Sequence, residues 1–103
     1  MQLDEMLTKV EKEVQDLENV ILNQGFNEWE ILAKLRGSEN VEDSKKSICS
    51  ILFTMMKSVN ERIKYMEKLK EQDQSETRIA HLIKRHTASG MALKALFQIV
   101  DDY

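Results

Sequence analysis

The sequence predicts an all-α protein, and three observations carry that prediction. The 103 residues contain no proline and only three glycines, too few turn-forming residues for a β-sandwich or barrel. Apolar residues recur at alternating steps of three and four, which is the spacing of one helical face. No stretch of useful length alternates between apolar and polar residues as a strand does. The length suits one domain, so we expect a single unit over residues 1–103.

The first helical segment is expected over about residues 2–35. Its apolar seam comprises Leu3, Met6, Leu7, Val10, Val14, Leu17 and Ile21. Asn23, Gln24 and Gly25 interrupt the pattern, and Asn27 is a suitable N-cap for a further helix. We favour one long helix with a kink or break near Gly25 over two separate helices. A short fourth helix over 27–35 is the alternative.

Two polar connectors divide the rest of the chain into two further helices. Residues 36–40 combine a glycine with small polar residues, and a helix is expected to start between Asn40 and Ser44 and to end near Glu71. Its seam comprises Ile48, Ile51, Leu52, Met55, Val59, Ile63, Met66 and Leu69. After the polar residues 72–75, a third seam runs from Ile79 to Val100. Short connectors between amphipathic helices imply an elongated antiparallel three-helix bundle.

Charge is unevenly distributed along the chain. Residues 1–43 carry four basic and eleven acidic side chains, whereas residues 44–71 carry seven basic and three acidic ones. Opposite charge on successive helices suits an antiparallel hairpin and leaves no unopposed basic face for nucleic acid. We therefore expect no nucleic-acid partner.

The sequence favours an intracellular protein that does not enter a membrane. The longest mainly apolar run, over residues 48–56, is about half the length of a membrane-spanning helix. The first five residues carry two acids and no basic region, unlike a secretory signal. Cys49 is the one cysteine and cannot form an internal disulfide, which indicates a reducing, cytoplasmic compartment.

Motifs for catalysis, cofactors and metals do not emerge from the sequence. His81 and His86 are five residues apart, about 140° around a helix, which does not place two ligands on one metal. No phosphate loop, dinucleotide fingerprint or Ser/His/Asp set occurs. We therefore expect a non-enzymatic protein with no catalytic, cofactor-binding or metal-binding residues. His86 lies on the apolar seam, so we expect a hydrogen-bonded histidine in the core or at its boundary, whereas His81 lies off the seam and is expected in solvent.

The residues that follow His86 nevertheless suggest one alternative function, phosphoryl transfer. The stretch His86-Thr-Ala-Ser-Gly90 resembles the motif of histidine phosphotransfer domains, in which glycine follows the histidine four positions later. That resemblance implies phosphoryl transfer through His86 on a bundle helix. The family's usual lysine is replaced by Ser89, and its histidine is exposed, whereas His86 lies on the seam.

Small residues gather around Gly90 on the last helical segment. A glycine inside a helix costs about 1 kcal/mol relative to alanine, so a contact should offset it. We expect a bulky neighbour, such as Trp29 or Phe53, to pack over Gly90. The functional alternative is a groove for a partner helix. The residues assigned to that groove are Ala88, Met91, Ala92 and Ala95.

Three further stretches carry a resemblance to a known family. They are Glu13-Val14-Gln15, Phe26-Asn27-Glu28-Trp29, and Arg78-Ile79 with the run to Val100 and Tyr103. With the helical layout, they make the chain similar to the N-terminal regulatory domain of syntaxin-type SNARE proteins. The resemblance implies a three-helix bundle that acts in vesicle trafficking by binding a SNARE helix or a trafficking factor through an inter-helix groove.

The function expected from these observations is a protein–protein interaction module, acting as an adaptor or regulatory domain. Its partner would be an amphipathic helix. A self-assembling helical scaffold, or a small viral or phage accessory protein, is the alternative, because a regular seam also suits a coiled coil shared between copies. A homo-oligomer is therefore compatible with the sequence.

Overall fold

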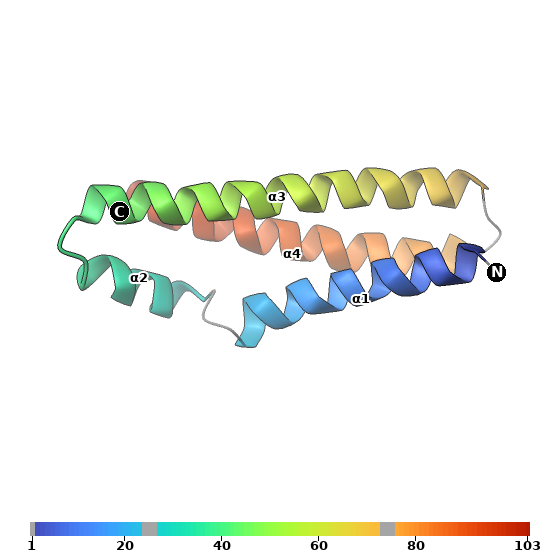
Figure 1. Ribbon diagram of the computed structural model, residues 1–103, viewed down its shortest axis with the longest axis horizontal. Coiled ribbons are helices and arrows are strands. Elements are labelled where there is room, and N and C mark those ends of the chain that lie inside the picture. Colours follow the sequence, from blue (N-terminus) through green and yellow to red (C-terminus); the bar gives the residue numbers. More distant parts are fainter. Residues whose placement is uncertain (1, 24–26, 73–75) are drawn as a thin grey trace.

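Four helices make up nearly all of the structure (Figure 1). The computed structural model describes residues 2–23, 27–72 and 76–103. The helices are α1 (Gln2–Asn23), α2 (Glu28–Arg36), α3 (Val41–Gln72) and α4 (Glu76–Asp102). The prediction of an elongated, all-α protein is confirmed, since the molecule measures 52 × 21 × 18 Å and the described residues contain no strand.

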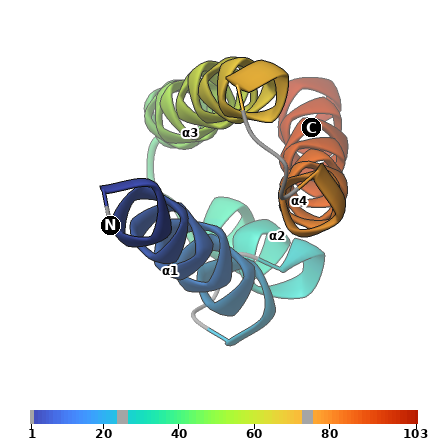
Figure 2. The ribbon, with the colours of Figure 1, turned by 90° about the vertical axis from the view of Figure 1, so that its right-hand side faces the viewer.

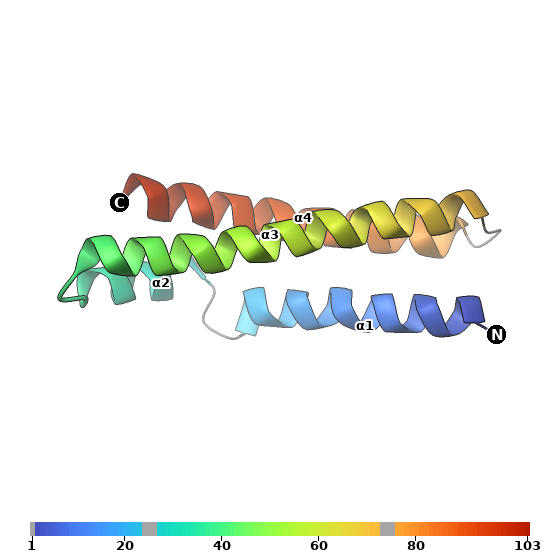
Figure 3. The ribbon, with the colours of Figure 1, turned by 45° about the horizontal axis from the view of Figure 1, so that its top comes forward.

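The described residues form four helices rather than the expected three, because the first segment forms two separate helices. α1 ends at Asn23 and α2 begins at Glu28, so the preference for one long helix over residues 2–35 is wrong. The new helix has its own start signal: the Glu30 amide donates a hydrogen bond to Asn27 Oδ1 at 3.0 Å, which confirms the predicted N-cap. α2 follows α1 along the long axis rather than folding back on it (Figures 1 and 3). Gly25 lies outside the described residues.

The loop between α2 and α3 lies where the sequence predicts it. The Gly37 amide donates to the Ala33 carbonyl at 3.0 Å and closes the last turn of α2. Asn40 then caps α3, since its Oδ1 accepts from the Asp43 amide at 3.2 Å. A backbone hydrogen bond therefore closes α2, and a polar side chain caps the start of α3.

α3 and α4 form a long antiparallel pair, and α1 and α2 lie along it one after the other (Figures 1 and 2). The pair packs closely at Gly90, where an added Cβ would lie 3.0 Å from Val59 Cγ1. The expectation that Trp29 or Phe53 covers Gly90 is wrong, because these side chains are 75% and 61% exposed. Val59 occupies that position because a glycine lets the two helix backbones approach one another.

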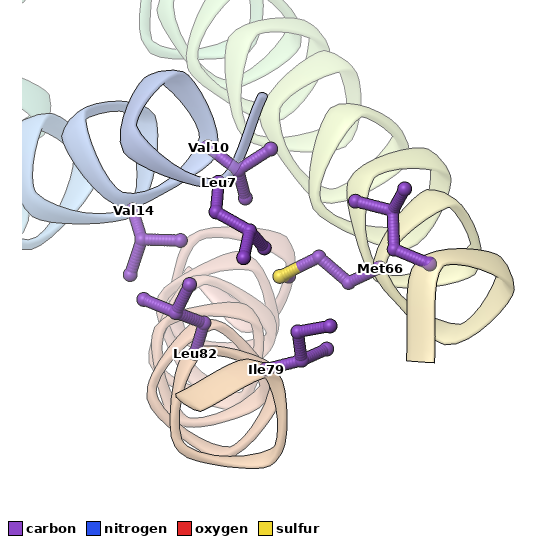
Figure 4. Packing of buried hydrophobic residues seen from close by; sticks show 7 residues of the cluster. Leu7, Val10, Val14, Met66, Ile79 and Leu82 are labelled. Atoms are coloured by element: carbon purple, nitrogen blue, oxygen red, sulfur yellow. The ribbon is translucent and has the colours of Figure 1, made fainter. Parts of the chain in front are cut away.

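Two apolar clusters fill the interior, one at each end. The first joins α1 to the α3–α4 pair (Figure 4). Its buried residues are Leu7, Val10, Val14, Met66, Leu69, Ile79 and Leu82. The second joins α2 to the same pair, and its buried residues are Ile31, Leu35, Leu52, Val59, Leu93, Leu96 and Val100. The predicted seams thus supply most of the core, although Ile51 of the α3 seam is 50% exposed. A shorter helix packs against each end of the long pair.

Candidate functional site

A shallow apolar hollow of about 270 Å³ lies between the end of α1 and the middle of α4. We call it the outer groove. It is lined by Glu18, Ile21 and Leu22 of α1 and by Arg85, Ala88, Ser89 and Ala92 of α4. The small side chains of α4 leave the groove open, and the larger apolar side chains of α1 form its opposite wall. Such a surface suits an apolar side chain brought by another helix.

An ion pair between Glu18 and Arg85 forms part of the lining of the outer groove. Arg85 donates from Nε to Glu18 Oε2 at 3.1 Å and from Nη2 to Glu18 Oε1 at 2.6 Å. The two parallel hydrogen bonds hold the pair in a defined geometry. The hydrogen bond from Arg85 lowers the pKa of Glu18 below its ordinary value, and the same bond raises the pKa of Arg85. Both groups are therefore charged at neutral pH, and they link α1 to α4.

The structure brings together two of the four predicted partner-binding residues. Ala88 and Ala92 line the outer groove, whereas Met91 and Ala95 do not. Met91 is 68% exposed and Ala95 is also exposed, so both face solvent on α4. Sequence reasoning missed Leu22, which is 73% exposed beside the groove. The signal for it was a large apolar residue next to Ile21 but off the seam of α1.

A second hollow, of about 390 Å³, opens between α1 and α3. Its lining mixes apolar and charged side chains: Met6, Lys9, Val10, Glu13, Ser58, Glu61, Arg62 and Tyr65. α1 packs chiefly on α4, so its other side leaves this space along α3. The mixed lining makes the second hollow less suitable for an apolar partner than the outer groove.

A polar layer of Glu13, Arg62 and His86 crosses the bundle between the two apolar clusters. Arg62 Nε lies 2.5 Å from Glu13 Oε2, and Arg62 Nη1 lies 3.0 Å from His86 Nε2. The three residues come from α1, α3 and α4 respectively. Arg62 has only donors, so His86 Nε2 must accept this hydrogen bond and carries no proton. The layer therefore connects three helices through one guanidinium group.

His86 is a neutral histidine of the interior, as its position on the seam predicts. Its side chain is 0% exposed, and Nδ1 is the only buried side-chain nitrogen or oxygen without a hydrogen-bond partner among the described residues. Burial, followed by the nearby charge of Arg62, lowers the pKa of His86 to about 4. Since phosphotransfer needs a ring nitrogen that a second protein can reach, this burial counts against the phosphotransfer alternative.

His81 and Cys49, the other residues considered for chemistry, do not line the outer groove. His81 is exposed, as expected, and Cys49 is half-buried with its thiol pKa raised by burial. Within the described ranges no group of three or more His, Cys, Asp or Glu residues is placed to hold a metal ion. The same described helices include none with the length and apolarity to cross a membrane. Phe26 lies outside the described residues.

Comparisons with known proteins found no matching family model, curated protein or solved structure. The resemblance to syntaxin regulatory domains therefore stays a prediction carried by the stretches quoted above.

Proposed function

We propose that this chain is a non-enzymatic protein–protein interaction module that captures an amphipathic helix of a partner protein in the outer groove. The observation that carries the proposal is the apolar lining of that groove. Alanines at positions 88 and 92 provide the space, and Ile21 and Leu22 provide the apolar wall. A helix that inserts a large apolar side chain there would remove Leu22, now 73% exposed, from water.

The resemblance to the syntaxin regulatory domains suggests which class of partner protein the module binds. The partner would then be a SNARE helix or a trafficking factor, and the module would act inside the cell, where the free thiol of Cys49 stays reduced. Neither membrane insertion nor a cofactor is part of the proposal.

Ala92→Glu tests the outer groove. Partners are first identified by affinity capture with the full chain, and binding of each purified partner is then measured by calorimetry. A carboxylate in the apolar groove should weaken binding at least tenfold, about 1.4 kcal/mol. Ala80→Glu is the matched control, because Ala80 is an exposed alanine of α4 outside this groove, and it should change the affinity less than twofold.

Two other results would contradict the proposal. If Ala95→Glu abolishes binding while Ala92→Glu does not, the partner uses the outward face of α4 rather than the groove. If light scattering across a concentration range shows a stable dimer that Ala92→Glu dissociates, the groove is occupied by a second copy. The self-assembling scaffold would then be the better description.

A further inference from the structure

We propose that the chain binds a phosphate group, carried by a phosphorylated side chain of a partner protein, where α3 ends and α4 begins. The site is a hollow of about 400 Å³, which we call the basic hollow. Its lining residues are Lys70 of α3 and Thr77, Ala80, His81 and Lys84 of α4. It shares no residue with the outer groove, so this inference does not rest on the proposed function.

One face of α4 and the last turns of α3 position the basic hollow. Thr77, His81 and Lys84 follow one another at steps of four and three, so they project from the same face of α4. Lys70 lies two residues before the end of α3, and the antiparallel pairing of the two helices places it beside the first turns of α4 (Figure 1). Two lysines from different helices therefore border one hollow.

The lining supplies positive charge and hydrogen-bond donors. Lys70 and Lys84 each carry an ammonium group with three donors. The Thr77 hydroxyl can donate, and so can His81, because one ring nitrogen of even a neutral imidazole carries a proton. The fifth lining residue, Ala80, has a side chain too short to fill the space. This set suits a phosphate group, which is negatively charged and accepts hydrogen bonds through several oxygens.

The described residues that line the basic hollow include no carboxylate. The outer groove and the second hollow differ in this respect, since each includes at least one glutamate. Glu67 and Glu71 are close to Lys70 in the sequence but do not line the basic hollow. A negatively charged ligand would therefore meet donors there without a carboxylate in the lining to repel it.

Both lysines are available to a ligand. Lys70 and Lys84 are exposed, and within the described ranges neither takes part in an ion pair. The arginines of α3 and α4 that face α1 differ, because Arg62, Arg78 and Arg85 are each paired with a glutamate. An anion can therefore enter the basic hollow without breaking an ion pair of these lysines.

The shape and charge of the basic hollow favour a phosphate carried by a protein chain. Small-molecule sites enclose most of their ligand, whereas this hollow is open to solvent. Lipid recognition through charge uses clusters of about four to eight lysines and arginines, and only two lysines line this hollow. A phosphorylated side chain brings a charge of about −1.5 to −2 at pH 7 to the two ammonium groups, while the rest of the partner stays outside.

The test is a titration of the isotope-labelled full chain, followed by NMR of the backbone amides in a low-salt buffer. The probe is a short glycine peptide with phosphoserine at its centre, and the matched control peptide has serine instead. The amide signals of Thr77, His81 and Lys84 should shift in a saturable manner with the phosphopeptide. The phosphopeptide should bind at least tenfold more tightly than the serine peptide.

Paired lysine substitutions locate the binding. The chain with Lys70→Gln and Lys84→Gln should bind the phosphopeptide at least tenfold more weakly, and both positions are exposed, so the fold should be retained. The matched control has Lys57→Gln and Lys94→Gln, which remove the same charge from exposed positions of α3 and α4 outside the hollow. It should change the affinity less than twofold. Ala92→Glu in the outer groove should leave phosphopeptide binding unchanged, so the two proposals can fail separately.

Several results would overturn the proposal. Shifts that do not saturate, equal binding of the two peptides, or equal weakening by the two paired substitutions would show that only the net charge of the chain matters. Inorganic phosphate that binds at least tenfold more tightly than the phosphopeptide would identify free phosphate as the ligand. Equimolar phosphatidylserine–phosphatidylcholine vesicles that bind the chain, but not its Lys70→Gln, Lys84→Gln variant, would identify a membrane surface if the phosphopeptide does not bind.

Discussion

The two ends of the molecule are held together differently. Each apolar cluster buries seven described side chains, but nine partly buried apolar side chains pack against the second cluster and three against the first. At the α1 end, arginines of α3 and α4 also form ion pairs with carboxylates of α1. The pairs are Arg62–Glu13, Arg78–Glu11 and Arg85–Glu18. Among the described residues, α2 takes part in no ion pair with the long helices. The comparison shows that α2 is held by apolar packing and α1 by packing combined with charge.

The polar layer lies between these two ends and gives the molecule its register. Arg62 meets Glu13 and His86 only when three helices are correctly aligned along the long axis. A shift of one helical turn, about 5.4 Å, would leave Arg62 or the buried His86 without its partner. Apolar seams tolerate such shifts better, because one apolar contact can replace another. We therefore expect the layer to select the alignment rather than to add much stability.

The largest change in the free energy of unfolding is expected for a substitution that weakens the apolar packing of α2. Leu35 is 0% exposed in the second cluster, so Leu35→Ala should lower the free energy of unfolding by about 2–5 kcal/mol. The loss should be nearly the same at 0.05 M and 1 M salt in urea titrations, because no ion pair is involved. Leu22→Ala is the matched control: this leucine is 73% exposed and its truncation should cost less than about 0.5 kcal/mol. A strong salt dependence for Leu35→Ala would contradict the comparison.

A medium effect is expected from titration of the polar layer. The pKa of His86 is lowered from 6.5 to about 4 in the folded chain, so the unfolded chain binds more protons between these values. Stability from this group is complete above pH 6.5 and falls as the pH drops toward 4. Between pH 7.5 and pH 5 the free energy of unfolding should fall by about 2 kcal/mol.

His86→Gln should remove most of this pH dependence, whereas His81→Gln, at an exposed histidine of the same helix, should keep it. The measurement is chemical unfolding at several pH values. Glu18 has a lowered pKa and contributes at lower pH, since its stabilisation is lost only as the pH falls below about 4.5. A slope between pH 5 and 7.5 that survives His86→Gln would show that another group is responsible.

The smallest effect concerns the close approach of α3 and α4. Gly90→Ala improves helix propensity by about 1 kcal/mol, but its Cβ would lie 3.0 Å from Val59 Cγ1. We expect the two effects to cancel, leaving a net change below about 0.5 kcal/mol in thermal unfolding. In a Val59→Ala background the clash is gone, and Gly90→Ala should then stabilise by about 1 kcal/mol. Equal effects in both backgrounds would mean that Val59 does not limit the approach.

Much of the helical structure was predictable because its signals are local. The seams follow the helical period, Asn27 caps α2 through an amide three residues away, and a glycine-containing loop precedes α3. The sequence indicates an interruption near Gly25 but favours one long helix over two. Periodicity alone does not distinguish a kinked helix from two helices that share a side of the bundle.

The candidate site was only partly predictable for the same physical reason. The small residues of α4 marked Ala88 and Ala92, yet the wall opposite them comes from Ile21 and Leu22 on α1. The bulk of Trp29 and Phe53 favours them as the neighbours of Gly90, but the structure places Val59 there. Size suggests which side chains can fill a space, but the relative rotation of two helices decides which one does.

The sequence by itself determined the fold class, the helical seams and the caps, because each depends on residues within a few positions of one another. The tertiary structure alone decided which distant side chains meet. Glu18 and Arg85 are separated by 67 residues, and Arg62 and His86 by 24, so no local rule pairs them. Their pairing, and with it the outer groove, depends on how all four helices share their apolar seams at once.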